Sequence, residues 1–156
     1  MTRAIYRRPW RVDVDVREGV STPASIGSLV GAIAEALDAV HAPAPASIGL
    51  ILTDDAEIAA LNATHMGHRG PTDVLSFPLL PPTAFDPGAA APDVPRPPGR
   101  RIHLGDIVVS VERAIEQAEA GRGGQTGDVR WSPADEMRLL VTHGTLHICG
   151  WDHATP

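Results

Sequence analysis

The stretch SPADEMRLLVTHGTLHICG, residues 132–150, reads as one complete α-helix close to the end of the chain. Ser132 is suited to accept hydrogen bonds from the free N–H groups at a helix start, and Pro133 suits the first helical position. Two acidic residues in the first turn favour the positive end of the helix dipole. Gly150 supplies the left-handed residue at which helices commonly end. The sequence therefore predicts a helix from about Pro133 to Cys149.

The remaining chain alternates between strand-like and helix-like segments. We expect strands in WRVDVDV, ASIGLILT, TDVLSFPL and RIHLGDIVVS, and helices from about Pro23 to Val40, over DDAEIAALN after an Asp54 cap, and from Ser110 to Ala120. A segment at 81–99 contains seven prolines and predicts a surface insert between strands. These patterns predict an α+β fold: one domain over residues 1–156, with a mixed sheet of about four strands and helices packed on it.

Composition narrows the class of protein. The net charge is −6, and all thirteen basic residues are arginine, so a broad basic surface for non-specific nucleic-acid binding is not expected. Two local basic clusters exist, RRPWR at 7–11 and GRRIH at 99–103, and each alone is interpreted as solvated surface charge. The single cysteine allows no internal disulfide, and no apolar run is long enough to span a membrane. We expect a cytoplasmic protein.

Three histidines lie near the end of the chain. His143 and His147 are four residues apart, so both rings lie on one face of the predicted helix and can bind one metal ion. A third ligand has to come from chain that has turned back, and Gly150 permits the turn that brings His153 there. Zinc accepts neutral imidazoles, and three protein ligands leave a fourth position for water, as in catalytic sites. Cys149 faces away from the pair and is interpreted as a core residue.

The spacing of the first two histidines also occurs in zinc proteases, whose motif is H-E-x-x-H with glutamate as the general base. In HGTLH, Gly144 stands where that glutamate would be. Peptide hydrolysis by this route therefore lacks its base.

The stretch HGTLHICGWDH, residues 143–153, resembles the signature of the YbeY family of endoribonucleases, the bacterial rRNA maturation factors. PTDVLSFPL at 71–79 and LGDIVVS at 104–110 resemble two further blocks of that family in the same order. LNATHMGHRG resembles the family's L-N-x-x-Y-R region, but Met66 stands where the family usually has arginine.

The resemblance implies an α+β fold with one zinc ion on His143, His147 and His153. It also implies cleavage of single-stranded RNA in rRNA processing and ribosome quality control, with the ribosome or its proteins as a partner. Asp106 matches the acidic residue of the L-G-D-I block, and we expect it near the metal as the residue that orients the nucleophile or carries a proton. Asp73 is interpreted as structural.

Phosphate contacts are expected from arginines, whose planar guanidinium suits bidentate binding. The candidates are Arg69, Arg100 and Arg101. Two alternatives remain open from the sequence: a non-catalytic ribosome-assembly factor in which zinc only holds the C-terminal turn, and a zinc hydrolase of a small molecule or peptide.

Overall fold

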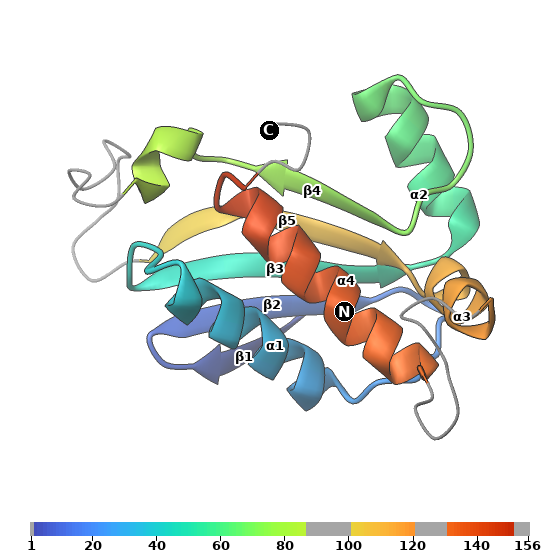
Figure 1. Cartoon of the computed structure of the whole chain (residues 1–156), viewed down its shortest axis with the longest axis horizontal. Coiled ribbons are helices and arrows are strands. Elements are labelled where there is room, and N and C mark those ends of the chain that lie inside the picture. The colour runs from blue at the N-terminus through green and yellow to red at the C-terminus, as the bar shows by residue number, and fades with distance from the viewer. Residues whose placement is uncertain (1, 87–100, 121–130, 152–156) are drawn as a thin grey trace.

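The structure, a computed structural model, describes residues 2–86, 101–120 and 131–151 (Figure 1). Arg100, His153 and most of the proline-rich segment lie outside these residues. The elements in chain order are β1 Thr2–Arg7, β2 Trp10–Val16, α1 Ile26–Ala39, β3 Ala46–Thr53, α2 Asp55–Leu61, the π-helix η1 Asn62–Met66, β4 Val74–Pro78, the 3-10 helix η2 Pro82–Phe85, β5 Ile102–Ser110, α3 Val111–Glu119 and α4 Pro133–Ile148. This arrangement confirms an α+β fold with a mixed sheet.

The sheet has five strands in the order β1-β2-β3-β5-β4. The three inner strands β2, β3 and β5 run parallel, while the edge strands β1 and β4 pair antiparallel with their neighbours. The four predicted strands are all present, and the prediction of about four missed β1. This strand lies at an edge with nearly every side chain exposed on both faces, so its sequence shows no alternation of apolar and polar residues.

The helices α1 and α4 lie side by side across one face of the sheet (Figure 1). Side chains that point from the inner strands toward these helices form the main core, in which Ile48, Leu50 and Ile107 are fully buried. A smaller apolar cluster lies on the opposite face, where Ile58 of α2 packs against β4 and β5. The end of the opposite face formed by β1 and β2 has no helix packed on it among the described residues. No helix in the described ranges is long and apolar enough to cross a membrane.

The predicted ends of α4 are confirmed. Ser132 accepts a hydrogen bond from the Asp135 backbone, and the Asp135 carboxylate accepts one from the Ser132 backbone, which together form a capping box. At the other end Gly150 has φ +92°, and the backbone N–H of Trp151 donates to the Leu146 carbonyl at 3.0 Å. The chain therefore leaves the helix in a left-handed turn directly after the second histidine.

Candidate metal and RNA site

His143 and His147 lie on one face of α4, one helical turn apart. Their ring centroids are 4.8 Å from each other with the planes tilted by 39°. Both rings line an open cleft of about 290 Å³ at the edge of the sheet. The other residues that line it are Met66, Asp73, Val74, Leu75 and Ser76. The cleft therefore lies between α4, the edge strand β4 and the end of η1.

Gly144, between the two histidines, allows α4 to pack directly on the sheet. A Cβ at this position would lie 2.8 Å from Cγ2 of Ile107 and 3.3 Å from Oγ of Ser76. The Ser76 hydroxyl donates a hydrogen bond of 3.1 Å to the Gly144 carbonyl oxygen. The position that holds glutamate in zinc proteases thus faces the sheet in this chain, where no side chain fits.

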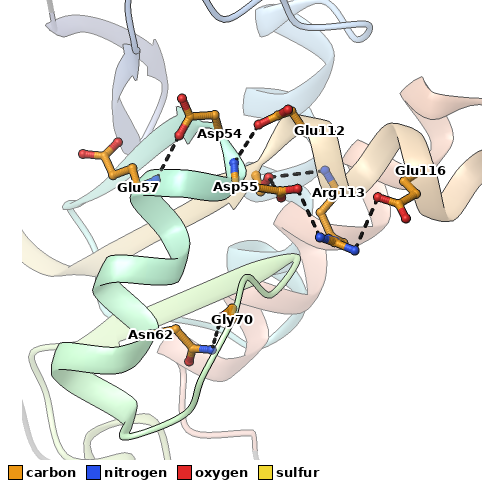
Figure 2. A network of polar contacts seen from close by, with 9 residues as sticks. Asp54, Asp55, Glu57, Asn62, Gly70, Glu112, Arg113 and Glu116 are labelled. Atoms are coloured by element: carbon orange, nitrogen blue, oxygen red, sulfur yellow. Dashed lines mark hydrogen bonds and ion pairs between the residues drawn. The ribbon is translucent and has the colours of Figure 1, made fainter.

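The wall of the cleft opposite α4 ends in Met66, which is 40% exposed. The substitution noted in the sequence therefore places a thioether in the cleft, where the family pattern has a cation. Asn62 donates from Nδ2 to the carbonyl oxygen of Gly70 at 3.0 Å, which ties the start of η1 to the loop that follows it (Figure 2). Arg69 lies exposed on this loop, three residues after Met66.

A polar network fixes the start of α2, the helix that continues into η1 (Figure 2). Asp54 accepts a hydrogen bond from the Glu57 backbone at 2.9 Å, and the Asp55 backbone donates to Glu112 of α3 at 2.8 Å. Arg113 pairs with the Asp55 carboxylate at 3.1 Å and with Glu116 at 3.4 Å. These contacts tie α2 to α3, and α2 continues into the π-helix that carries Met66. The network therefore positions one wall of the cleft.

Asp73 lies in the cleft wall at the start of β4. Its Oδ1 atom accepts a hydrogen bond of 2.7 Å from the Val74 backbone, and its own carbonyl oxygen accepts one from the Ser110 backbone at 3.0 Å. These bonds agree with the structural role interpreted from the sequence. Its place in the cleft, like that of Ser76, was not inferred, although both residues belong to the PTDVLSFPL block.

Asp106 is not among the residues that line the cleft of His143 and His147, and its expected role beside a metal stays a prediction. Its Oδ1 atom is 2.9 Å from Nε2 of His103, whose Nδ1 atom is 2.8 Å from the Ser47 hydroxyl. The carboxylate lies over Gly49, on the face of the sheet away from α4. A bulge causes this placement: β5 has one extra residue where Gly105 adopts φ +153°, so Asp106 is shifted to the face opposite Ile107.

Arg101 also lies away from the histidine pair. Its Nη1 atom donates to the Pro9 carbonyl oxygen at 2.5 Å, and its Cζ atom is 5.4 Å from the ring centroid of Tyr6. It therefore contacts the β1–β2 hairpin, at the far edge of the sheet from β4. Of the three predicted phosphate contacts, Arg69 alone among the described residues lies on the loop next to the cleft.

The pair of imidazoles suits a metal such as zinc, because the two rings face one cleft and a left-handed turn at Gly150 follows three residues after the second. Among residues 2–86, 101–120 and 131–151, no group of three histidine, cysteine or acidic side chains is placed to hold an ion. The third ligand predicted from the sequence, His153, lies outside that part of the chain. Cys149 is buried, as expected for a core residue, and burial raises the pKa of its thiol to about 12.

Comparisons with known proteins identify relatives of the chain. A family model described as Endoribonuclease YbeY matches residues 16–156. The Endoribonuclease YbeY of Trichormus variabilis is 42% identical over 120 residues, which cover 76% of this chain and 60% of that protein. The Endoribonuclease YbeY of Thermobifida fusca is 37% identical over 148 residues, which cover 93% of this chain and 83% of that protein.

The chain spans between 54% and 60% of the length of the first three curated relatives that it matches. Among solved structures, the solution structure of TM1509 from Thermotoga maritima is 22% identical and covers 90% of this chain and 74% of that one, with a TM-score of 0.47. The match of the family model to residues 16–156 and the identity to the Thermobifida fusca protein agree with the three sequence blocks. The chain belongs to the Endoribonuclease YbeY family.

Proposed function

We propose that this protein is a zinc-dependent endoribonuclease that cleaves single-stranded RNA during rRNA maturation and ribosome quality control in the cytoplasm. The observation that carries the proposal is the pair His143 and His147, whose centroids lie 4.8 Å apart at a cleft. The relatives are named endoribonucleases, which supports a nuclease, and the cleft has room for a phosphodiester beside the two rings.

His143, His147 and His153 would hold one zinc ion, with His153 reaching it through the turn at Gly150. Bound zinc supplies a polarising charge for a phosphodiester oxygen and a bound water whose pKa falls to about 7. The hydrogen bond from Ser76 to Gly144 and the close contact of Gly144 with Ile107 hold α4 against the sheet. These contacts would hold the first two ligands in place before a metal or an RNA binds.

The RNA strand would reach the cleft over the loop after η1. Arg69 lies exposed on that loop and would hold a phosphate next to the scissile one. Met66 contributes an apolar surface where the family pattern has an arginine. Positive charge at the cleft of this protein would therefore come from Arg69. Asp106 lies on the opposite face of the sheet, and we give it no role on the reacting atoms.

The test measures zinc content and RNA cleavage in parallel on the full chain. Purified protein is expected to contain one zinc per chain and to cut an unstructured rRNA fragment. His147→Ala is expected to lose both properties. His41→Asn is the matched control, because it removes an exposed imidazole at a left-handed residue (φ +53°), a conformation that asparagine tolerates.

Three results would contradict the proposal in different ways. Equal cleavage by the parent chain and His147→Ala would show that the histidine site takes no part in the reaction. Bound zinc without cleavage of any RNA would leave a ribosome-assembly factor that uses zinc only for its fold. Cleavage of a peptide but not of RNA would identify a hydrolase of another class.

A further inference from the structure

The two basic clusters of the sequence meet in the structure. Arg101, from the second cluster, donates to the carbonyl oxygen of Pro9 in the first cluster at 2.5 Å, although the two residues are 92 positions apart. The Arg101 guanidinium also lies over the ring of Tyr6, with Cζ 5.4 Å from the centroid. Each cluster alone was interpreted as solvated charge, but the fold combines them at one end of the β1–β2 hairpin.

Tyr6 is the centre of this surface and is 57% exposed. Strand register places it on the same sheet face as Arg11, Ser47 and His103, in one row across β1, β2, β3 and β5. The helices α1 and α4 cover the other face of the sheet (Figure 1), so neither helix covers the Tyr6 ring. An exposed aromatic ring beside a guanidinium is a surface on which a nucleic-acid base can stack.

The charge around Tyr6 is not balanced. Arg8 is exposed in the hairpin turn, whereas Arg7 pairs with Trp10 and lies on the face of the sheet that α1 covers. In the described part of the chain, no carboxylate pairs with Arg8 or Arg101, whereas Arg11 is paired with Asp13 at 3.2 Å. A chain of net charge −6 thus presents a small region of unpaired positive charge. That region complements a polyanion.

We propose that Tyr6, Arg8 and Arg101 form a docking surface for single-stranded RNA, separate from the cleft at His143 and His147. A base would stack on Tyr6 while neighbouring phosphates contact Arg8 and Arg101. The proposal rests on the proposed function, because it takes the substrate of that site as its ligand. An acidic protein segment would use the same charges, but it would not require an accessible aromatic ring.

The position of this surface determines what it does. β1 and β4 are the two edges of a five-stranded sheet, so four interstrand spacings, about 19 Å, separate them. His143 and His147, on α4, also lie on the sheet face opposite to Tyr6. The surface therefore contacts nucleotides outside the segment in the cleft, and it favours long single strands over short ones.

The experiment measures binding of a fluorescein-labelled 20-nucleotide (CA)10 RNA to the full chain by anisotropy, with EDTA present to prevent zinc-dependent cleavage. Arg8→Gln with Arg101→Gln is expected to weaken binding and to reduce the slope of log K against log salt by about 1.4, since each phosphate contact contributes about 0.7. Tyr6→Ala is expected to weaken binding about fivefold or more, and Tyr6→Phe, which keeps the ring, restores it.

Arg3→Gln is the matched control. Arg3 is an exposed arginine of the same strand, but it pairs with Val14 and lies on the opposite face, beside Ile26. The same loss of charge there is expected to leave the affinity and the salt slope unchanged. Circular dichroism of each variant shows whether the hairpin variants keep the fold.

The outcomes separate this inference from the proposed function. Unchanged affinity and slope in the double variant overturn the docking surface, even if the parent chain cuts RNA and His147→Ala does not. Lost binding in the double variant supports the docking surface, even if no cleavage is found. Binding of a polyglutamate peptide that depends on Arg8 and Arg101, without binding of the RNA, overturns the proposal in favour of an acidic protein partner.

Discussion

The Ser76 hydroxyl donates a hydrogen bond of 3.1 Å to the carbonyl oxygen of Gly144, and this bond joins the edge strand β4 to α4 between its two histidines. Gly144 has no side chain to separate the helix from the strand, and Ile107 of β5 fills the space beside it. The distance of His143 and His147 from the wall of the cleft therefore depends on how closely α4 packs on the sheet.

Gly144→Ala is expected to lower the free energy of unfolding by about 1–3 kcal/mol, as overpacking does in a dense interior. The added methyl group would lie 2.8 Å from Ile107, and the helix or the strand has to move. Displacement of α4 also changes the relation of the histidines to β4, so zinc affinity is expected to fall. Denaturant unfolding and competition with a fluorescent zinc chelator measure the two effects.

Gly27→Ala is the matched control for this substitution. Gly27 lies in the first turn of α1, and no atom lies within 4 Å of the position that its Cβ would occupy. Alanine is favoured over glycine in a helix by up to about 1 kcal/mol, so this variant is expected to be as stable as the parent or more so. Equal loss of stability in both variants would show that close packing at Gly144 is not the cause.

Asp106→Asn is expected to keep the zinc content of the parent and an RNA cleavage rate of the same order of magnitude. The physical reason is position: the carboxylate contacts His103 and lies over Gly49, across the sheet from α4. Zinc analysis and a cleavage time course on the same preparations test this expectation. If Asp106→Asn retains zinc but loses cleavage as completely as His147→Ala, Asp106 takes part in the reaction.

Most of the fold follows from local sequence signals. The capping residues Ser132 and Gly150 mark both ends of α4, and Asp54 and Ser110 cap the two shorter helices as expected. The inner strands were predicted because one of their faces is buried and apolar. β1 lacks such a face, since residues such as Arg3 and Tyr6 are exposed on both sides, and its pairing with β2 depends on tertiary structure.

The candidate site was predictable in part. Two histidines four apart on a helix lie together because helix geometry is regular, and the ring centroids of His143 and His147 are indeed 4.8 Å apart. The face of Asp106 was not predictable, because strict alternation along β5 places it with Leu104, and the bulge at Gly105 reverses that order. The meeting of Arg101 with Tyr6 depends on strand order, which no local motif encodes.

Cys149 is expected to be unreactive toward iodoacetamide in the folded protein at pH 8. It is 2% exposed, and burial raises the pKa of its thiol to about 12, so very little thiolate forms and little reagent reaches it. Mass spectrometry is expected to find the thiol unmodified in buffer and fully modified in guanidinium chloride. Rapid modification of the native protein would show that the end of α4 opens, and with it the turn at Gly150.

The ion pair between Arg17 and Glu57 predicts how stability changes in acid. Arg17 Nε donates to Glu57 Oε1 at 3.0 Å, and this bond, followed by one from Thr53, lowers the pKa of the Glu57 carboxyl from 4.5. A carboxyl pKa that is lower in the folded state than in the unfolded state stabilises the folded protein at pH values above the unfolded-state pKa. That contribution is lost as pH falls below about 4.5 and through the folded pKa.

Glu57→Gln is therefore expected to be less stable than the parent at pH 7, by about 0.5 kcal/mol because the pair is partly exposed, and to lose less stability than the parent between pH 5 and pH 3. Denaturant unfolding at a series of pH values measures the stability at pH 7 and its loss between pH 5 and pH 3.

Glu119→Gln, at an exposed carboxyl in the last turn of α3, is the matched control and is expected to keep the acid profile of the parent. If Glu57→Gln and the parent lose the same stability between pH 5 and pH 3, the bond to Arg17 does not hold Glu57 in its charged form. In that case the link from β2 to the start of α2, the element that leads to Met66 and the cleft, is weaker than its geometry indicates.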